Sequence, residues 1–186
     1  MSITREKIME LGENLIRTKG YNGFSYQDIS SEMGIKNAAV HYYFPSKESL
    51  GTSIVKTNIQ RFEEMVDNLQ NRNFDEMHQL ETFLKIYLKS HREQKLCIMG
   101  ALSPDFNTLN ESTRNELKKM TDMVLVWLAN LLEKGHTNGV FLFRCKAGDK
   151  ALIILSTMIA GLQLTRVMDK IEFKSIYQAI LDDIKA

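Results

Sequence analysis

The sequence predicts an all-α protein with an N-terminal three-helix helix-turn-helix domain, followed by a larger helical domain. Three observations lead to this prediction. Apolar residues recur at intervals of three and four along most of the chain. Glycine and proline interrupt the pattern where helices would end. One short run, Val140–Phe143, has the composition of a strand, but it has no second strand to join. A chain of 186 residues then holds about nine helices of typical length.

Composition excludes several classes of protein. The chain is 44% hydrophobic and 25% charged, which is typical of a folded globular protein, and its net charge of +1 gives no general basic excess. Two cysteines are too few for a disulfide-stapled secreted domain. The N-terminal residues lack the apolar core of a signal peptide, and the longest apolar stretch, residues 151–164, is shorter than the roughly 20 residues of a membrane span. We therefore expect a cytoplasmic protein with reduced thiols and no membrane contact.

The first helix is predicted from an apolar stripe that runs from Ile8 to Ile16, and it ends at Gly20. Residues 25–50 then form the most informative segment, with the helix-turn-helix motif over about residues 25–44. Ser25 followed by Asp28 matches the pattern that caps a helix, and Gly34 lies where that helix must stop and turn. A short second helix, residues 36–44, follows the turn. Two helices joined by a tight glycine turn predict a helix-turn-helix.

Longer helices are predicted for the rest of the chain. Pro45 ends the helix-turn-helix, and Ser46 can cap a long helix whose first turn holds Lys47. Each later helix carries an apolar stripe. The stripes run through residues 55–69, 77–91, 117–131, 151–162 and 173–184.

Residues 5–50 resemble the DNA-binding domain of the TetR/AcrR family of transcriptional regulators. The resemblance is carried by Gly20-Tyr21, Ser25, Asp28-Ile29, Gly34-Ile35, the run from Tyr43 to Glu48, and Leu50. Two positions depart from the family pattern: His41 stands where tyrosine is common, and Ala38-Ala39 replaces a glycine followed by a hydroxyl residue. The remaining residues resemble the family in helical architecture and length.

The resemblance implies a DNA-binding domain over residues 1–50 and a ligand-binding and dimerisation domain over residues 51–186. It implies a ligand-responsive regulator, a repressor, that binds a palindromic operator in double-stranded DNA as a homodimer and is released by a small-molecule inducer. Lys36 and Asn37 begin the recognition helix, so we expect them to reach base edges, whereas Ala39 can contact a thymine methyl. Lys47 beside a helix N-terminus is suited to a phosphate. The full set of expected DNA contacts is Ser25, Tyr26, Lys36, Asn37, Ala39, His41, Tyr42, Tyr43 and Lys47.

Apolar and aromatic side chains predict the inducer site and the dimer interface. The inducer is then a small apolar or aromatic molecule. The expected ligand-binding residues are Phe62, Phe83, Tyr87, Cys97, Val124, Trp127, Met158 and Leu162. The last two stripes predict a four-helix bundle across a two-fold axis. The expected interface residues are Ala151, Leu155, Met158, Ile159, Leu162, Phe173, Tyr177, Ile180, Leu181 and Ile184.

Several alternatives stay open. Cys97 is either a small buried residue or a thiol that reacts with an electrophile or oxidant, and Cys145 is a second candidate thiol. The first 50 residues hold six basic and six acidic side chains, which keeps open a helical regulatory or protein-interaction protein that has lost operator binding. A helical enzyme is a further alternative, although no catalytic motif, cofactor motif or metal-ligand spacing is evident. We therefore expect no enzyme activity, no cofactor and no metal.

Overall fold

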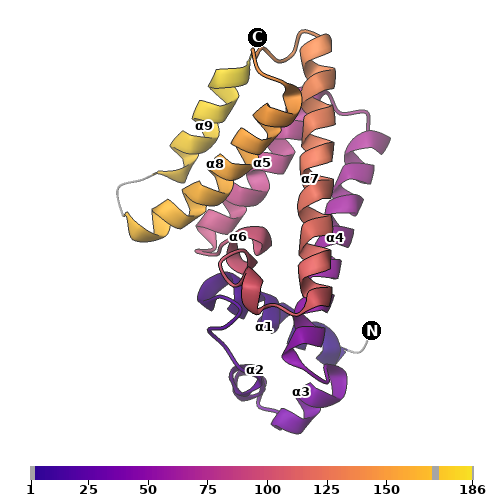
Figure 1. The fold of residues 1–186 in the computed structure, drawn as a ribbon, viewed down its shortest axis with the longest axis vertical. Coiled ribbons are helices and arrows are strands. Elements are labelled where there is room, and N and C mark those ends of the chain that lie inside the picture. Colours follow the sequence, from indigo (N-terminus) through magenta and orange to yellow (C-terminus); the bar gives the residue numbers. More distant parts are fainter. Residues whose placement is uncertain (1–2, 169–171, 186) are drawn as a thin grey trace. The chain divides into compact units, whose positions relative to one another are not determined.

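The computed structural model describes residues 3–168 and 172–185, and within these residues it is all-α, as predicted (Figure 1). Its helices are α1 (Ile3–Lys19), α2 (Tyr26–Met33), α3 (Asn37–Tyr43), α4 (Lys47–Asn71), α5 (Glu76–Arg92), α6 (Ile98–Leu102), the 3-10 helix η1 (Phe106–Thr108), α7 (Glu111–Thr137), α8 (Ala147–Val167) and α9 (Phe173–Ile184). The strand-like run at Val140–Phe143 contributes one isolated antiparallel bridge, between Phe141 and Lys185.

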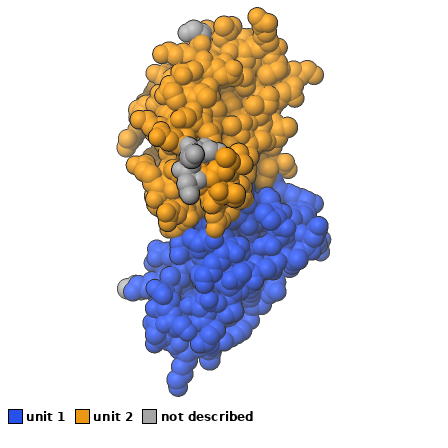
Figure 2. Space-filling view, turned by 90° about the vertical axis from the view of Figure 1, so that its left-hand side faces the viewer, with its two compact units in different colours: residues 1–62, 98–120 blue, residues 63–97, 121–186 orange. Residues whose placement is uncertain are grey.

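The chain forms two compact units (Figure 2). Unit 1 consists of residues 1–62 and 98–120, and unit 2 consists of residues 63–97 and 121–186. Helices α4 and α7 each contribute residues to both units. The structure thus places α6, η1 and the start of α7 with the N-terminal residues, whereas the functional division at residue 50 stays a prediction.

The core of unit 1 holds α1, α2 and α3 together. Ile8, Ile29, Val40 and Leu50 are fully buried, and Phe44 is 2% exposed. These residues come from the apolar positions of four helices, so burial of apolar surface fixes how the short helices pack.

Hydrogen bonds attach the later segment of unit 1 to the α1–α2 loop. The Asn22 amide donates to Asp105 Oδ1 at 3.0 Å and to Thr108 Oγ1 at 2.9 Å. The hydroxyls of Thr52 on α4 and Thr113 on α7 lie 2.8 Å apart. Because Thr113 is fully buried, this pairing satisfies a polar group that would otherwise be costly to bury.

Unit 2 is built around the packing of α5, α8 and α9. Leu80, Leu84, Met158 and Phe173 are fully buried in this core. A Cβ added at Gly161 of α8 would lie 3.0 Å from the Phe173 ring, so α8 and α9 approach each other closely at this glycine. Buried Glu76 is paired with Lys134 at 3.1 Å, which joins α5 to α7.

Helix α8 is longer than the apolar stretch that the sequence indicates. Its 21 residues, with a mean hydropathy of 1.3 over the best window, are long and apolar enough to cross a membrane. A third of that window is buried against the rest of the protein. A core helix of a soluble protein has the same properties, so this single helix is weak support for a membrane span.

Candidate DNA-binding surface

Local sequence determines the ends of α2. The backbone N–H of Ser25 donates to Asp28 Oδ2 at 2.8 Å, and the Ser25 hydroxyl donates to the same oxygen at 2.8 Å. These two bonds, with Lys19 at 3.2 Å, lower the pKa of Asp28 from 3.8 to about 2. At the other end Gly34 adopts a φ of 64°, the left-handed conformation that glycine favours. The capping and turn predictions are therefore confirmed.

The recognition helix α3 presents a polar face to solvent. Lys36, Asn37 and His41 are exposed, and the Tyr42 side chain is 81% exposed. Ala39 and Tyr43 are half-buried, and Val40 faces the core. The side chains of Lys36, Asn37, His41 and Tyr42 thus point outward, as predicted, and are available to a partner.

Tyr26 has a different position from the one predicted for a DNA contact. It is 7% exposed, and its hydroxyl donates to the Phe44 carbonyl at 2.9 Å. Burial raises the pKa of this phenol to about 12. Its ring meets the His41 ring edge-on, with centroids 4.8 Å apart. Because its hydroxyl is used inside the protein, Tyr26 positions the end of α3, which corrects the expectation that it reaches the DNA backbone.

Lys47 also has internal partners. Ser46 caps α4, since its hydroxyl accepts from the Ser49 N–H at 3.2 Å, as predicted. The Lys47 ammonium, however, donates to the Phe24 carbonyl and lies over the rings of Phe24 and Tyr21, at 4.2 Å and 4.9 Å from their centroids. Burial lowers the pKa of Lys47. A phosphate contact by Lys47 stays a prediction that would require these contacts to be exchanged.

Arg5 is a basic residue that sequence reasoning missed. Its guanidinium lies 4.7 Å from the centroid of the Phe44 ring, at the end of α3. The only sequence signal for it is a basic side chain in the first turn of the first helix, and that signal does not show which later residue lies beside it. The fold thus adds a cation near the recognition helix.

The predicted ligand-binding residues lie in the two units. Phe62 is buried in unit 1, and the other members of the set belong to unit 2. The Phe83 ring lies 5.5 Å from Tyr87 and 5.4 Å from Trp127. Phe83, Tyr87, Cys97, Val124, Met158 and Leu162 are all buried, and Trp127 is half-buried. Burial also raises the pKa of Tyr87 well above its usual value. Neither Cys97 nor Cys145 forms a disulfide among the described residues, and the first is buried whereas the second is exposed.

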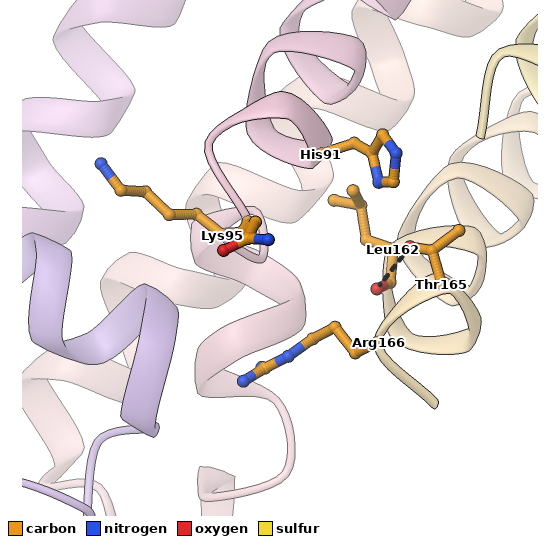
Figure 3. Close-up of a pocket in the computed structure, with 6 residues that line it drawn as sticks. His91, Lys95, Leu162, Thr165 and Arg166 are labelled. Atoms are coloured by element: carbon orange, nitrogen blue, oxygen red, sulfur yellow. Dashed lines mark hydrogen bonds between the residues drawn. The ribbon is translucent and has the colours of Figure 1, made fainter. Parts of the chain in front are cut away.

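Unit 2 also contains a pocket of about 380 Å³ at the end of α5 and the last turns of α8 (Figure 3). Of the predicted ligand-binding residues, Leu162 lines it. The described residues that line it are His91, Gln94, Lys95, Leu162, Thr165 and Arg166. Sequence reasoning missed the polar members of this set. No group of three or more histidine, cysteine or acidic residues able to hold a metal occurs in the described part of the chain.

The predicted dimer-interface residues need a correction. All are buried inside the chain except Ile159, which is half-buried. They form the contact of α8 with α5 and α9, so they are core residues of the single chain. The apolar residues that α8 exposes are different. They are Leu152, Ile153, Leu164 and Val167, followed by Met168 at the end of the helix.

Comparison with known proteins agrees with this geometry. Residues 8–52 match the family model of bacterial regulatory proteins of the tetR family. A TetR transcriptional regulator from Legionella pneumophila superposes with a TM-score of 0.87 and 29% identity, covering 100% of this chain and 99% of that one.

Two curated relatives are also similar in sequence. An uncharacterized HTH-type transcriptional regulator from Lactococcus lactis is 26% identical over 121 residues, 63% of this chain and 62% of that protein. The match therefore spans somewhat less than two thirds of the length of that relative. The biofilm operon HTH-type negative transcriptional regulator IcaR of Staphylococcus aureus is 25% identical over 131 residues, 63% of this chain and 69% of IcaR. The chain thus matches the tetR family model in its helix-turn-helix, and its all-α fold is that of TetR transcriptional regulators over its whole length.

Proposed function

We propose that this protein is a transcriptional repressor that binds operator DNA as a homodimer and is released by a small molecule. The observation that carries the proposal is the exposed polar face of α3. Lys36 and Asn37 begin this helix and His41 and Tyr42 follow one turn later, all exposed. A short helix with such a face, packed against a second helix, fits the major groove. The description of the relative IcaR as a negative regulator favours repression over activation.

The exposed face of α8 supports the homodimer. Leu152 and Ile153 near its start and Leu164 and Val167 near its end are 48–82% exposed. Ser156 and Ala160 lie between them on the exposed side of the helix and are small enough for close approach of a second helix. A two-fold axis at this face would pair α8 with its copy and bury the apolar stripe. A dimer of this kind places two recognition helices on the two half-sites of a palindrome.

The segment 98–120 supports a response to ligand. It belongs to unit 1, but it follows Cys97 of unit 2 directly in the chain, and it continues into α7. Its Asp105 and Thr108 hold Asn22 in the α1–α2 loop. A ligand that shifts α6 or α7 would therefore change the position of the helix-turn-helix, and DNA affinity would fall by the coupling free energy.

Fluorescence anisotropy with labelled DNA from the region upstream of the protein's own gene tests the proposal. We expect specific binding that weakens steeply with salt, and random DNA of equal length should bind much more weakly. Asn37→Ala should reduce discrimination at one base pair per half-site by about 1–3 kcal/mol, with unchanged stability. A protein that binds specific and random DNA equally at all salt concentrations contradicts the proposal and supports the alternative that operator binding has been lost.

The alternative that modification of the Cys97 thiol releases the protein from DNA can be tested separately. After treatment with a quinone, a reactive Cys97 would gain mass in intact-protein mass spectrometry, and Cys97→Ser would abolish release from DNA. Burial of Cys97 makes a reversible ligand the favoured version, because burial hinders access to the thiol. Exposed Cys145 is the internal control, since an adduct confined to Cys145 that leaves DNA binding intact removes the thiol-sensor version.

A further inference from the structure

Helix geometry determines which residues lie at the centre of the outward face of α3. Successive residues of an α-helix are rotated by about 100° around its axis. Val40 is fully buried, so it marks the side of α3 that faces the core. Ala38 and Tyr42 stand two residues before and after Val40, and each therefore points about 160° away from it. Both residues are exposed, Tyr42 to 81%, as this geometry requires.

The direct neighbours of Val40 lie at the sides of this face. Ala39 and His41 each point about 100° away from Val40. Ala39 is half-buried, and His41 is exposed. When a helix lies in the major groove, the residues opposite its buried side come closest to the base edges. Ala38 and Tyr42 therefore occupy the central position.

The Tyr42 ring is supported beside Ala38. Residues four positions apart are neighbours on a helix surface, with Cβ atoms about 5–6 Å apart, so one small group can touch both side chains. The Tyr43 ring meets the Tyr42 ring edge-on, with centroids 5.1 Å apart and an interplanar angle of 83°. Tyr43 is half-buried, so this contact restrains the exposed ring before any partner binds. A restrained side chain loses less entropy on binding.

The centre of the outward face is apolar, unlike Lys36 and Asn37 at the start of α3. Ala38 offers a methyl group, and Tyr42 offers an aromatic ring. The major-groove edges of the bases display hydrogen-bond donors and acceptors, and the 5-methyl group of thymine is their apolar feature. A donor or acceptor placed against Ala38 would lose water without gaining a partner. Thymine is therefore the base that this pair of side chains fits.

We propose that Ala38 and Tyr42 contact the 5-methyl group of one thymine in each operator half-site. The inference rests on the proposed function, because it names the DNA feature that the exposed face of α3 recognises. It moves the methyl contact from Ala39, the residue expected from the sequence, to Ala38.

Uracil substitution tests the contact, because uracil lacks the methyl group of thymine and keeps its hydrogen-bonding edge. Fluorescence anisotropy measures the affinity of the full chain for an operator duplex that the protein has selected from random DNA, with each thymine replaced by uracil in turn. We expect one position per half-site at which uracil weakens binding about fourfold, the factor that burial of one methyl group contributes. The salt slope should stay the same, because no phosphate contact is lost. An operator that tolerates uracil at every position overturns the proposal.

Two glycine variants assign the contact to a residue. Ala38→Gly removes the methyl group of the protein, so it should weaken binding to the thymine duplex and reduce the uracil effect to less than about twofold. Ala39→Gly makes the same change one residue further along, and it should keep the uracil effect of about fourfold. A full uracil effect in Ala38→Gly, or its loss in Ala39→Gly, overturns the assignment to Ala38.

Tyr42 gives a second test that introduces no glycine into the helix. Glycine weakens a short helix, so thermal melts of the two glycine variants are compared with that of the parent. Because Tyr42 is 81% exposed, Tyr42→Ala should leave the fold intact and should also reduce the uracil effect. Tyr42→Phe keeps the ring and should retain the effect. Loss of the effect in Tyr42→Phe would assign the contribution to the hydroxyl and would contradict an apolar contact.

The same binding data separate this inference from the proposed function. If the protein selects no sequence from random DNA, the proposed function fails and the methyl contact fails with it. If it binds a selected operator in which no thymine methyl group affects affinity, the proposed function stands and the methyl contact alone is overturned. Specific binding with a uracil effect that depends on Ala38 supports both.

Discussion

Replacing Lys47 by methionine tests whether this lysine stabilises the helix-turn-helix from within or binds a DNA phosphate. Its ammonium donates to the Phe24 carbonyl and lies over the rings of Tyr21 and Phe24. A charge-assisted hydrogen bond contributes about 1.5–3 kcal/mol, and each cation–π contact at an exposed site about 0.5–1 kcal/mol. Desolvation of the ammonium offsets part of this, so we expect Lys47→Met to lower the free energy of unfolding by about 2 kcal/mol.

Two measurements on the same variant distinguish the two roles. Urea denaturation gives the free energy of unfolding, and DNA anisotropy from low to high salt gives the number of phosphate contacts. An internal role predicts lower stability and an unchanged salt slope. Lys36→Met is the matched control, because Lys36 is exposed at the start of α3. It should leave stability unchanged, and its effect on the salt slope shows whether Lys36 contacts a phosphate instead of the expected base edge.

The reasoning is refuted if Lys47→Met is as stable as the parent and the salt slope falls by about one unit. That outcome would mean that the internal contacts contribute little to stability and that Lys47 reaches DNA. Methionine keeps most of the apolar stem of lysine, so lost packing against the two rings would not explain a loss of stability.

Three further predictions concern stability and assembly. Gly135→Ala should destabilise the protein by about 1–3 kcal/mol, because its Cβ would lie 2.2 Å from Phe141 Cδ2. Gly148→Ala places its Cβ in open space and should raise the free energy of unfolding by up to about 1 kcal/mol. Melting temperatures of the two variants that move in the same direction would contradict this. The Asp28 carboxylate, with its pKa near 2 against 3.8, stabilises the native state above pH 4, and this contribution is lost as the pH falls toward 2. Asp28→Asn should therefore flatten the acid limb of the stability curve, and an unaltered limb would count against the capping bonds. Ile153→Glu should yield a folded monomer in sedimentation without detergent, because Ile153 is 54% exposed; a variant that stays dimeric removes this face from the interface.

Local features explain why the helix-turn-helix could be predicted from the sequence. The Ser25–Asp28 capping box and the left-handed turn at Gly34 depend on residues within a few positions of each other. The outward face of α3 likewise follows from one buried residue, Val40, within a short helix. Because these interactions join residues that are close together in the chain, a single sequence is enough to predict them.

The buried stripe of α8 could be predicted from the sequence, but the surface that covers it could not. Of the consecutive residues Leu152, Ile153, Ile154 and Leu155, the structure exposes the first two and buries the last two. Periodicity identifies an apolar stripe, but it does not show whether the stripe packs inside the chain or against a second copy. The contact of Asn22 with the later segment of unit 1 escaped prediction for another reason, since it joins residues far apart in the chain. The pocket combines residues of α5 and α8 in the same way.

The internal roles of Tyr26 and Lys47 also constrain how His41 can read DNA. The Nδ1 atom of His41 lies 3.2 Å from the Pro45 carbonyl, and a carbonyl can only accept, so Nδ1 carries the proton of this hydrogen bond. The Tyr26 ring meets the imidazole edge-on and helps to fix its orientation. In the neutral ring Nε2 is then an acceptor, which matches the amino group of cytosine or adenine and does not match a phosphate oxygen. His41→Ala should therefore reduce discrimination between base pairs in DNA anisotropy and leave the salt slope unchanged, whereas a flattened slope with unchanged discrimination would assign His41 to the DNA backbone rather than to a base.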